Sequence, residues 1–256
     1  MPSIEHLSYS SLSLYLLCGH AWKARYIDKV QMPTSPALVI GSAFHDAVES
    51  YVGGKQQDLE TAWTESWARQ LERNQVIEWG ATTPELAQED GLRMVRAKPV
   101  RTLVDTLRQN FDPETCEIEK RVELRVPGVP IPVIGYIDVI TRDGIPGDFK
   151  TAARMWADNK ASSELQPLFY LAALNQAGIA VPGWTFRHYV VSRSQHPTAK
   201  VFEVRRQPHE LFWLFEMIKA AWRGIEHEVY PMNTNTWRCS PQYCDVWGDC
   251  RGKYAI

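Results

Sequence analysis

The chain has 256 residues, of which 45% are hydrophobic and 23% are charged, so it can bury a large core as a globular domain. The formal net charge of -2 at pH 7 excludes a protein that coats nucleic acid through bulk positive charge, and any contact with nucleic acid must be local. Because no apolar run approaches ~20 residues and MPSIEHLSYS lacks the pattern of a signal peptide, we expect a cytoplasmic protein without a membrane partner.

The N-terminal third is expected to be helical. Residues 8–30 begin with serines that suit a helix cap, and Cys18 lies on an aromatic stripe with Trp22 and Tyr26 at i, i+4 spacing. Cys18 therefore faces inward, where a buried cysteine commonly serves as a small hydrophobic side chain. Residues 56–111 are expected to form a helical insert that breaks near Pro84 and Pro99.

A second helix is predicted from Gly41, after a proline-containing linker at 31–36. Its expected apolar face consists of Phe44, Ala47, Val48 and Tyr51. His45 lies at the edge of this face. A histidine in this position is either a hydrogen-bonded core residue or a metal ligand, and only the presence of other ligands favours the second role.

The central part of the chain is expected to form three successive strands. Alternating apolar and charged residues from Cys116 to Val126 predict the first strand, and Gly128 turns the chain into a hairpin at 135–151. Glu119 and Glu123 on the first strand either approach a metal or form salt bridges with neighbouring arginines. The remaining elements are a helix at 161–177, strands at 184–191 and 200–206, and a helix at 208–229.

The hairpin brings two carboxylates and a lysine together. It places Asp138 near Asp148 and Lys150, which share one face of a strand while Phe149 points into the core. One or two carboxylates with phosphate and water suffice to hold Mg2+ or Mn2+. Taken alone, Asp-x-Lys is a common pattern that usually forms a solvated charge pair, so the surrounding motifs decide between the two interpretations.

Four motifs occur along the chain: G-S-A-F-H at 41–45, G-Y-I-D at 135–138, D-F-K at 148–150 and Q-P-L-F-Y at 166–170. Together they resemble the RecB-type branch of the PD-(D/E)XK nucleases over most of the chain. The resemblance implies an α/β fold with a restriction-endonuclease-like core, in which helices flank a mixed β-sheet. We expect one domain over 1–256, with a helical part at 1–112, a nuclease core at 113–230 and a cysteine-rich tail at 231–256.

The resemblance also implies roles for individual residues. His45, Asp138, Asp148 and the Phe149 carbonyl are expected as metal ligands. Lys150 is expected to orient or activate the attacking water. Gln166 and Tyr170, which share one helical face, are expected to touch the DNA strand or brace the site. General chemistry agrees, because a divalent cation activates water and neutralises charge on the phosphate better than side chains alone.

Four of the five cysteines form a second pattern. Cys239, Cys244 and Cys250 follow each other as C-x4-C-x5-C, and Cys18 is remote. Four thiolates suit an iron-sulfur cluster or zinc. The arrangement is similar to the [4Fe-4S] staple of RecB-like exonucleases, which include AddB-type proteins and the CRISPR-associated exonucleases of the fourth Cas family. Many members have a tighter C-x2-C pair, so zinc and unligated thiols stay as alternatives, and Cys116 is expected to be unliganded.

The sequence therefore predicts a Mg2+- or Mn2+-dependent DNA exonuclease for single strands or frayed ends, in recombination, repair or CRISPR spacer acquisition. Its expected partners are DNA and an integrase, helicase or recombination protein. One rival is a catalytically silent DNA-binding scaffold, which the complete set of His45, Asp138, Asp148 and Lys150 disfavours. Another is an RNA or structure-specific endonuclease, because no motif indicates how a 2′-hydroxyl would be recognised.

Overall fold

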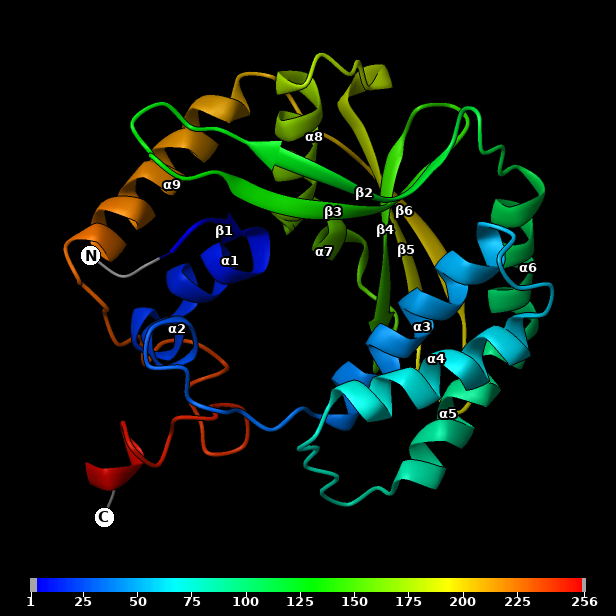
Figure 1. The fold of residues 1–256 in the computed structure, drawn as a ribbon, viewed down its shortest axis with the longest axis horizontal. Helices are drawn as coiled ribbons and strands as arrows, with labels where there is room; N and C mark the ends of the chain where they lie inside the picture. The colour runs from blue at the N-terminus through cyan, green and yellow to red at the C-terminus, as the bar shows by residue number, and fades with distance from the viewer. Residues whose placement is uncertain (1–3, 255–256) are drawn as a thin grey trace. The chain divides into compact units, whose positions relative to one another are not determined.

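The computed structural model describes residues 4–254 and contains a six-stranded mixed sheet and helices (Figure 1). Contacts divide the chain into two compact units. The smaller unit contains residues 4–33, 123–135 and 209–254, and the larger unit contains 34–122 and 136–208. Strands β2 (Glu117–Leu124) and β3 (Val133–Ile140) run from one unit into the other. Within the described residues, no helix combines the length and apolar character that a membrane span requires.

The sheet mixes parallel and antiparallel pairs. Strand β1 (Leu7–Ser8) lies parallel to β3, which pairs with β2 and lies antiparallel to β4 (Pro146–Ala152). Strand β4 lies parallel to β5 (Thr185–Ser192), and β5 is antiparallel to β6 (Ala199–Arg205). A parallel pair needs a crossover connection, and helices α7 and α8 supply it between β4 and β5. The predicted α/β class with a mixed sheet flanked by helices is confirmed.

In the smaller unit, the predicted helix at 8–30 is in fact two helices. Helix α1 (Tyr9–Leu17) begins with a capping box at Ser8, and α2 (Gly19–Tyr26) follows after Cys18, whose backbone is extended. The break coincides with a close approach of the C-terminal tail, because a Cβ atom on Gly19 would lie 2.6 Å from Cδ of Pro231. The prediction of one continuous helix was therefore wrong at Cys18.

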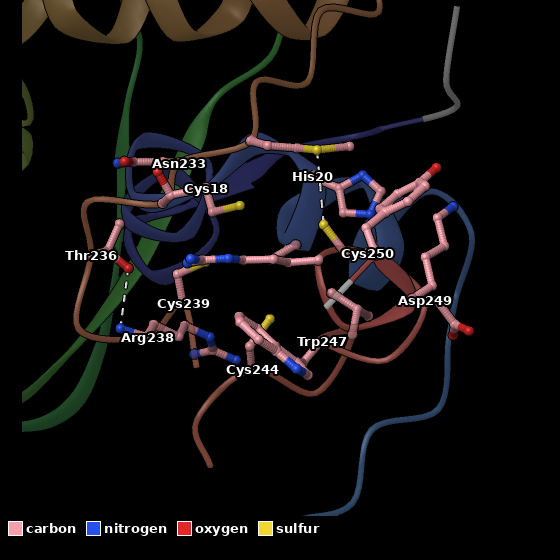
Figure 2. A pocket seen from close by; sticks show the side chains of 17 residues that line it. Cys18, His20, Asn233, Thr236, Arg238, Cys239, Cys244, Trp247, Asp249 and Cys250 are labelled. Carbon is pink, nitrogen blue, oxygen red and sulfur yellow. Dashed lines mark hydrogen bonds between the residues drawn. The ribbon is translucent and has the colours of Figure 1, made fainter. Parts of the chain in front are cut away.

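Two further contacts hold α1 and α2 against the chain that follows helix α9 (Glu210–Glu226). The Tyr15 hydroxyl donates a hydrogen bond to the Val229 carbonyl at 2.7 Å. The Trp22 ring stacks on Tyr230 with 5.8 Å between ring centroids. These contacts place Cys18 beside the cysteine-rich tail, which ends in the short helix η2 (Gly252–Tyr254), and Figure 2 shows the resulting cavity.

The larger unit begins with four helices: α3 (Pro36–Val52), α4 (Leu59–Arg73), α5 (Pro84–Arg96) and α6 (Lys98–Gln109). Helix α3 starts earlier than the predicted Gly41 because the Ser35 side chain accepts a hydrogen bond from the Leu38 amide and Pro36 occupies the first turn. Pro84 and Pro99 lie in the first turns of α5 and α6, where a missing N–H costs little. The predicted division of the insert at these prolines is confirmed.

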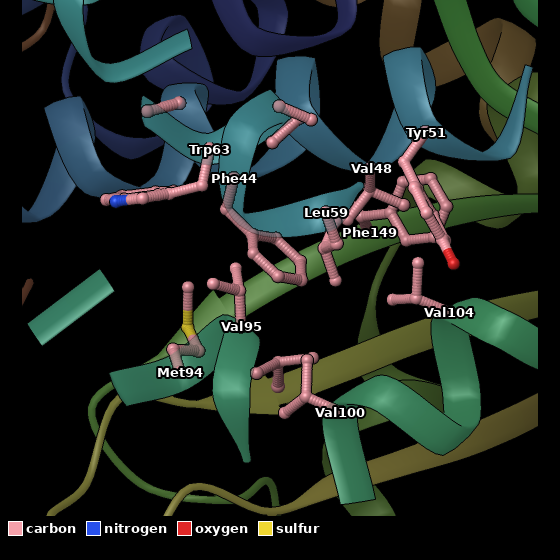
Figure 3. Close-up of a cluster of buried hydrophobic side chains, with 14 of the residues drawn as sticks. Phe44, Val48, Tyr51, Leu59, Trp63, Met94, Val95, Val100, Val104 and Phe149 are labelled. Atoms are coloured by element: carbon pink, nitrogen blue, oxygen red, sulfur yellow. The ribbon is translucent and has the colours of Figure 1, made fainter. Parts of the chain in front are cut away.

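The main core of the larger unit lies between these helices and one face of the sheet (Figure 3). Phe44 and Val48 of α3 and Trp63 of α4 are fully buried there, and Phe149 of β4 and Tyr189 of β5 meet them from the sheet. The predicted inward orientation of Phe149 is confirmed. This packing seats α3 directly on β4, so polar side chains along the edge of α3 come close to the strands.

The opposite face of the sheet carries α7 (Asp158–Ser163) and α8 (Gln166–Gln176), with Ala161 packed against Val190 and Phe202. One helix at 161–177 had been predicted. Two form because Pro167, in the first turn of α8, has no N–H for a bond to the preceding turn, so a continuous helix cannot pass through it. A short helix η1 (Pro182–Trp184) then leads into β5.

Candidate active site

Three side chains in the larger unit converge as a possible metal site. His45 and Glu49 lie one turn apart on α3, so they share a helical face, and Asp138 reaches them from β3. One ligand atom from each lies within 4.8 Å of the others. His45 Nδ1 is 3.2 Å from Asp138 Oδ2. Burial lowers the pKa of His45, but the Asp138 carboxylate outweighs that effect, and the pKa is raised overall.

Glu49 was not identified from the sequence. Burial, followed by the charges of Asp138 and Glu119, raises the pKa of Glu49 to about 8. The contributions of Asp138 and Glu119 to this rise reflect crowded negative charge, which a divalent cation would relieve. The spacing of four residues from His45 on one helix was the signal that could have revealed it.

The cavity around this group has a volume of about 590 Å³. Its polar lining includes the carboxylates of Asp46, Glu49, Glu119 and Asp138 and the cations Lys150 and Arg193. Of the two glutamates predicted near a metal or in salt bridges, Glu119 lines the cavity, whereas Glu123 forms a salt bridge with Arg125 at 2.7 Å. The backbone φ of Glu119 is 50°, which is uncommon for a residue other than glycine. An oxygen-rich donor set with one imidazole fits Mg2+ or Mn2+.

Asp148 lies outside that three-residue group and is only 3% exposed. Its Oδ2 is 2.6 Å from Lys150 Nζ, and its Oδ1 accepts a hydrogen bond from Gln166 Nε2 at 2.7 Å. Burial raises the pKa of Asp148 to about 6 and Asp138 adds to this rise, while Lys150 opposes it. The structure therefore joins Asp148 to Lys150 and Gln166, and its role as a direct metal ligand stays a prediction.

Phe149 connects the two predicted carboxylates through its backbone. Its amide donates a hydrogen bond to Asp138 Oδ2 at 2.6 Å, which fixes the orientation of the Asp138 side chain. The residue also lines the cavity. Ligation of a metal by the Phe149 carbonyl stays a prediction.

Gln166 and Tyr170 of α8 form hydrogen bonds to the strands that carry Asp138 and Asp148. Besides its bond to Asp148, Gln166 Nε2 lies 3.3 Å from the Tyr170 hydroxyl. That hydroxyl donates to the carbonyl of Tyr136 at 2.5 Å, two residues before Asp138 on β3. These contacts link β3 to β4 through α8, so of the two expected roles they support bracing.

Tyr170→Phe should therefore reduce turnover by about tenfold, a much smaller loss than removal of Asp138, because it removes one hydrogen bond that positions β3. The melting temperature should fall slightly, since a net hydrogen bond contributes about 1 kcal/mol. Steady-state cleavage rates and thermal melts measure both effects. An unchanged rate together with an unchanged melting temperature would remove any role for the hydroxyl.

Glu49→Gln should weaken binding of Mn2+ by at least about tenfold while the fold survives, because it removes one charged donor. In the metal-free protein the pKa of Glu49 is about 8 instead of the ordinary 4.5, so the folded state binds the Glu49 proton more tightly than the unfolded state does. The stability that this proton contributes is complete below about pH 4.5 and is lost as the pH rises through 8. The metal-free variant should then melt with a weaker pH dependence between 5 and 8 than the wild type.

Thermal melts across this pH range, with and without Mn2+, test the Glu49 prediction. Glu65→Gln on α4 is a matched control, because Glu65 contacts Gln56 and lies outside the cavity. A Glu49→Gln protein that keeps the full Mn2+-induced rise in melting temperature would contradict the assignment of Glu49 to the metal site.

The four predicted cysteine ligands line one cavity of about 380 Å³ in the smaller unit, as Figure 2 shows for Cys18, Cys239, Cys244 and Cys250. All four are free thiols. Burial raises the pKa of the Cys244 thiol, and Cys18 contributes to the same rise. Cys116 is buried in the larger unit, directly before β2, and lies within 3.7 Å of the Asn110 carbonyl. The sequence placed it inside the first strand, one residue too early.

Comparisons with known proteins agree with this architecture. The structure resembles that of a Eubacterium rectale protein provisionally named as an exonuclease, with a TM-score of 0.59 and 13% sequence identity. The match covers 98% of this chain and 89% of the other chain. At that identity the likeness shows the fold alone. SSO0001 aligns over 95% of each chain with 15% identity and a TM-score of only 0.37, too low to support an argument. No protein of curated function matches the chain.

A model of one family covers nearly all of the sequence, from residue 6 to residue 251. That span includes the helix with His45, the strands with Asp138 and Asp148, and the bracing helix α8. The convergence of an imidazole and carboxylates on an oxygen-rich cavity suits metal-dependent phosphodiester hydrolysis. The chain belongs to the PD-(D/E)XK nuclease superfamily.

Proposed function

We propose that this protein is a DNA exonuclease of the RecB-like type that hydrolyses phosphodiesters at single-stranded or frayed ends with Mg2+ or Mn2+. The observation that carries the proposal is the convergence of His45, Glu49 and Asp138 on one cavity that Lys150 also lines. An unbroken set of this kind disfavours a silent scaffold, because a protein that only binds DNA has no need to crowd carboxylates that repel phosphate.

Each residue has a defined task in this proposal. A bound divalent cation would neutralise charge on the phosphate and make water a better nucleophile. His45, Glu49 and Asp138 would hold that cation. Lys150, whose ammonium contacts Asp148, would orient the attacking water, and Gln166 would keep Asp148 in place through its 2.7 Å hydrogen bond.

We further propose that the smaller unit holds a [4Fe-4S] cluster on Cys18, Cys239, Cys244 and Cys250. Support comes from four free thiols around one cavity, with Cys18 fixed beside the tail by the close approach of Gly19 to Pro231. Among the described residues, these cysteines do not form a group whose ligand atoms lie within 4.8 Å of one another.

End-labelled single- and double-stranded DNA and the matching RNA strands, digested with Mg2+, Mn2+ or EDTA, test the proposal. A metal-dependent ladder or mononucleotide product from DNA, with different patterns for 5′ and 3′ labels, is expected. Discrete internal cuts would indicate an endonuclease, and preferential digestion of RNA would replace DNA as the substrate. Retention of labelled DNA without any cleavage would favour the scaffold and overturn the proposal.

The proposed substrate also defines the class of partner. An enzyme that acts on single strands or frayed ends needs another protein to separate or present those ends, such as a helicase, an integrase or a recombination protein. Stimulation of duplex digestion by a strand-separating helicase would support this partnership. Equal digestion of blunt duplexes in its absence would make such a partner unnecessary.

A further inference from the structure

Arg193 lies at the edge of the metal-site cavity but has no place in the chemistry described so far. It follows β5 directly, and its amide donates a hydrogen bond to the Ala152 carbonyl at the end of β4 at 2.7 Å. The residue lines the same cavity as His45, Glu49 and Asp138. A positive side chain therefore faces a space that is otherwise dominated by carboxylates.

The guanidinium group of Arg193 has an unmet hydrogen-bonding capacity. Within residues 4–254 its Nε is buried and has no hydrogen-bond partner. Asp90 of α5 is the charge that raises its pKa, but the Asp90 carboxylate is already paired with Arg93. Burial lowers the pKa of Arg193, yet an arginine keeps its charge at neutral pH. A buried N–H group left without an acceptor destabilises a protein, so the unpaired Nε of Arg193 needs an explanation.

We propose that Arg193 binds a backbone phosphate of the substrate strand, adjacent to the scissile phosphate. The inference rests on the proposed nuclease function and adds a residue that positions the strand. A guanidinium fork matches two oxygens of a phosphate, whereas the carboxylates that line the same cavity would repel a polyanion. Arg193 lies outside all four of the sequence motifs.

The register of the sheet explains why the contact is to a neighbouring phosphate. Lys150 is aligned with Val190 and Ala152 with Ser192, so Arg193 lies three residues beyond Lys150 in the direction of the strands. At about 3.3 Å per residue this offset is about 10 Å. Alternation places Arg193 on the same face of β5 as Val191 and Tyr189, the face that packs against α3.

Binding of a fluorescein-labelled oligothymidylate, measured by anisotropy in EDTA over a series of salt concentrations, tests the inference without any cleavage. Arg193→Gln should bind about tenfold more weakly than the wild type, and the slope of log K against log salt should fall by about 0.7, the value for one contact to a single strand. In oligonucleotides with one uncharged methylphosphonate, a single linkage position should weaken the wild type and leave Arg193→Gln unaffected.

Two further variants separate a phosphate contact from a structural role. Arg96→Gln on α5 is the matched control, because Arg96 pairs with Glu60 at 2.7 Å and does not line this cavity, and it should bind as the wild type does. Arg193→Lys should recover most of the salt slope but only part of the affinity, since it keeps the charge and loses the fork. Under cleavage conditions, Arg193→Gln should raise KM more than it lowers kcat.

The outcomes distinguish this inference from the proposed function. If the wild type digests DNA and Arg193→Gln keeps both its affinity and its salt slope, the phosphate contact is wrong and the nuclease proposal stands. If Arg193→Gln loses one phosphate contact but the wild type cleaves no nucleic acid, the contact is supported and the nuclease proposal fails. Equal losses for Arg193→Gln and Arg96→Gln would also overturn the inference, because they would indicate a general effect of charge.

Discussion

Lys150→Ala is expected to lower the rate of phosphodiester cleavage by at least about 10³-fold, the scale of losing a positioned catalytic group. The Lys150 ammonium lies 2.6 Å from Asp148 Oδ2 and lines the metal-site cavity, so its removal affects both the attacking water and the charge of Asp148. Without the lysine, the pKa of the buried Asp148 should rise further, and the carboxylate would be less available in its ionised form. Asp138→Ala and Asp148→Ala should be equally inactive.

Binding of DNA and the melting temperature should change much less than the rate, because Lys150 is partly exposed and fills little core volume. Lys150→Arg keeps a positive charge beside Asp148 and should still be slow, since a guanidinium cannot take the place of a compact ammonium at the water position. Lys219→Ala, which removes a surface lysine paired with Glu216 on α9, is the control. A purified Lys150→Ala protein that cuts DNA at the wild-type rate would show that the active centre is assigned wrongly.

The second large effect is expected for Cys239→Ala, which should give colourless, protease-sensitive and poorly soluble protein. A cluster on Cys18 and the three late cysteines would close nearly the whole chain into a loop. By analogy with disulfide loop entropy, such a link stabilises the folded chain by up to about 5 kcal/mol, which is comparable to the total stability of a domain. Any loss of cleavage should follow the folded fraction, because the proposed cluster would have no part in the chemical step.

Cys116→Ala is a matched control for this experiment, because Cys116 is a buried free thiol that does not line the cysteine cavity. It should keep the colour and the iron and sulfide content of anaerobically purified wild-type protein. If the purified protein held zinc in place of iron, the link between Cys18 and the three late cysteines would remain but the iron-sulfur cluster would be refuted. A melting temperature of Cys239→Ala equal to that of the wild type would refute stabilisation by the cysteine link itself.

Local pattern was sufficient to predict the strands and the approach of Asp138 to Asp148 and Lys150, whereas the roles of these residues came from the family resemblance. Alternation around Asp138 and Asp148 predicted a hairpin, and the structure brings β3 and β4 together as neighbours with Asp138 Oδ2 bound to the Phe149 amide. The helical period of α3 placed His45 at the edge of an apolar face, and Phe44 and Val48 are indeed buried. These features follow from periodicity because side-chain direction in a strand or helix is set by backbone geometry within a few residues.

Other features depended on contacts between distant segments. In the sequence, Glu49 is one of many charged residues on predicted helices. The packing of α3 against β4 brings Glu49 close to Asp138 and buries it, which raises its pKa to about 8. The break at Cys18 arises where Gly19 meets Pro231, more than two hundred residues away along the chain. The burial of Arg193 Nε beside the same cavity, without a hydrogen-bond partner among residues 4–254, likewise arises only from packing. The sequence by itself determined the type and approximate place of most elements and supplied most of the candidate site residues. Burial, local charge and the break of a helix by a remote segment are properties of packing, which no local pattern encodes.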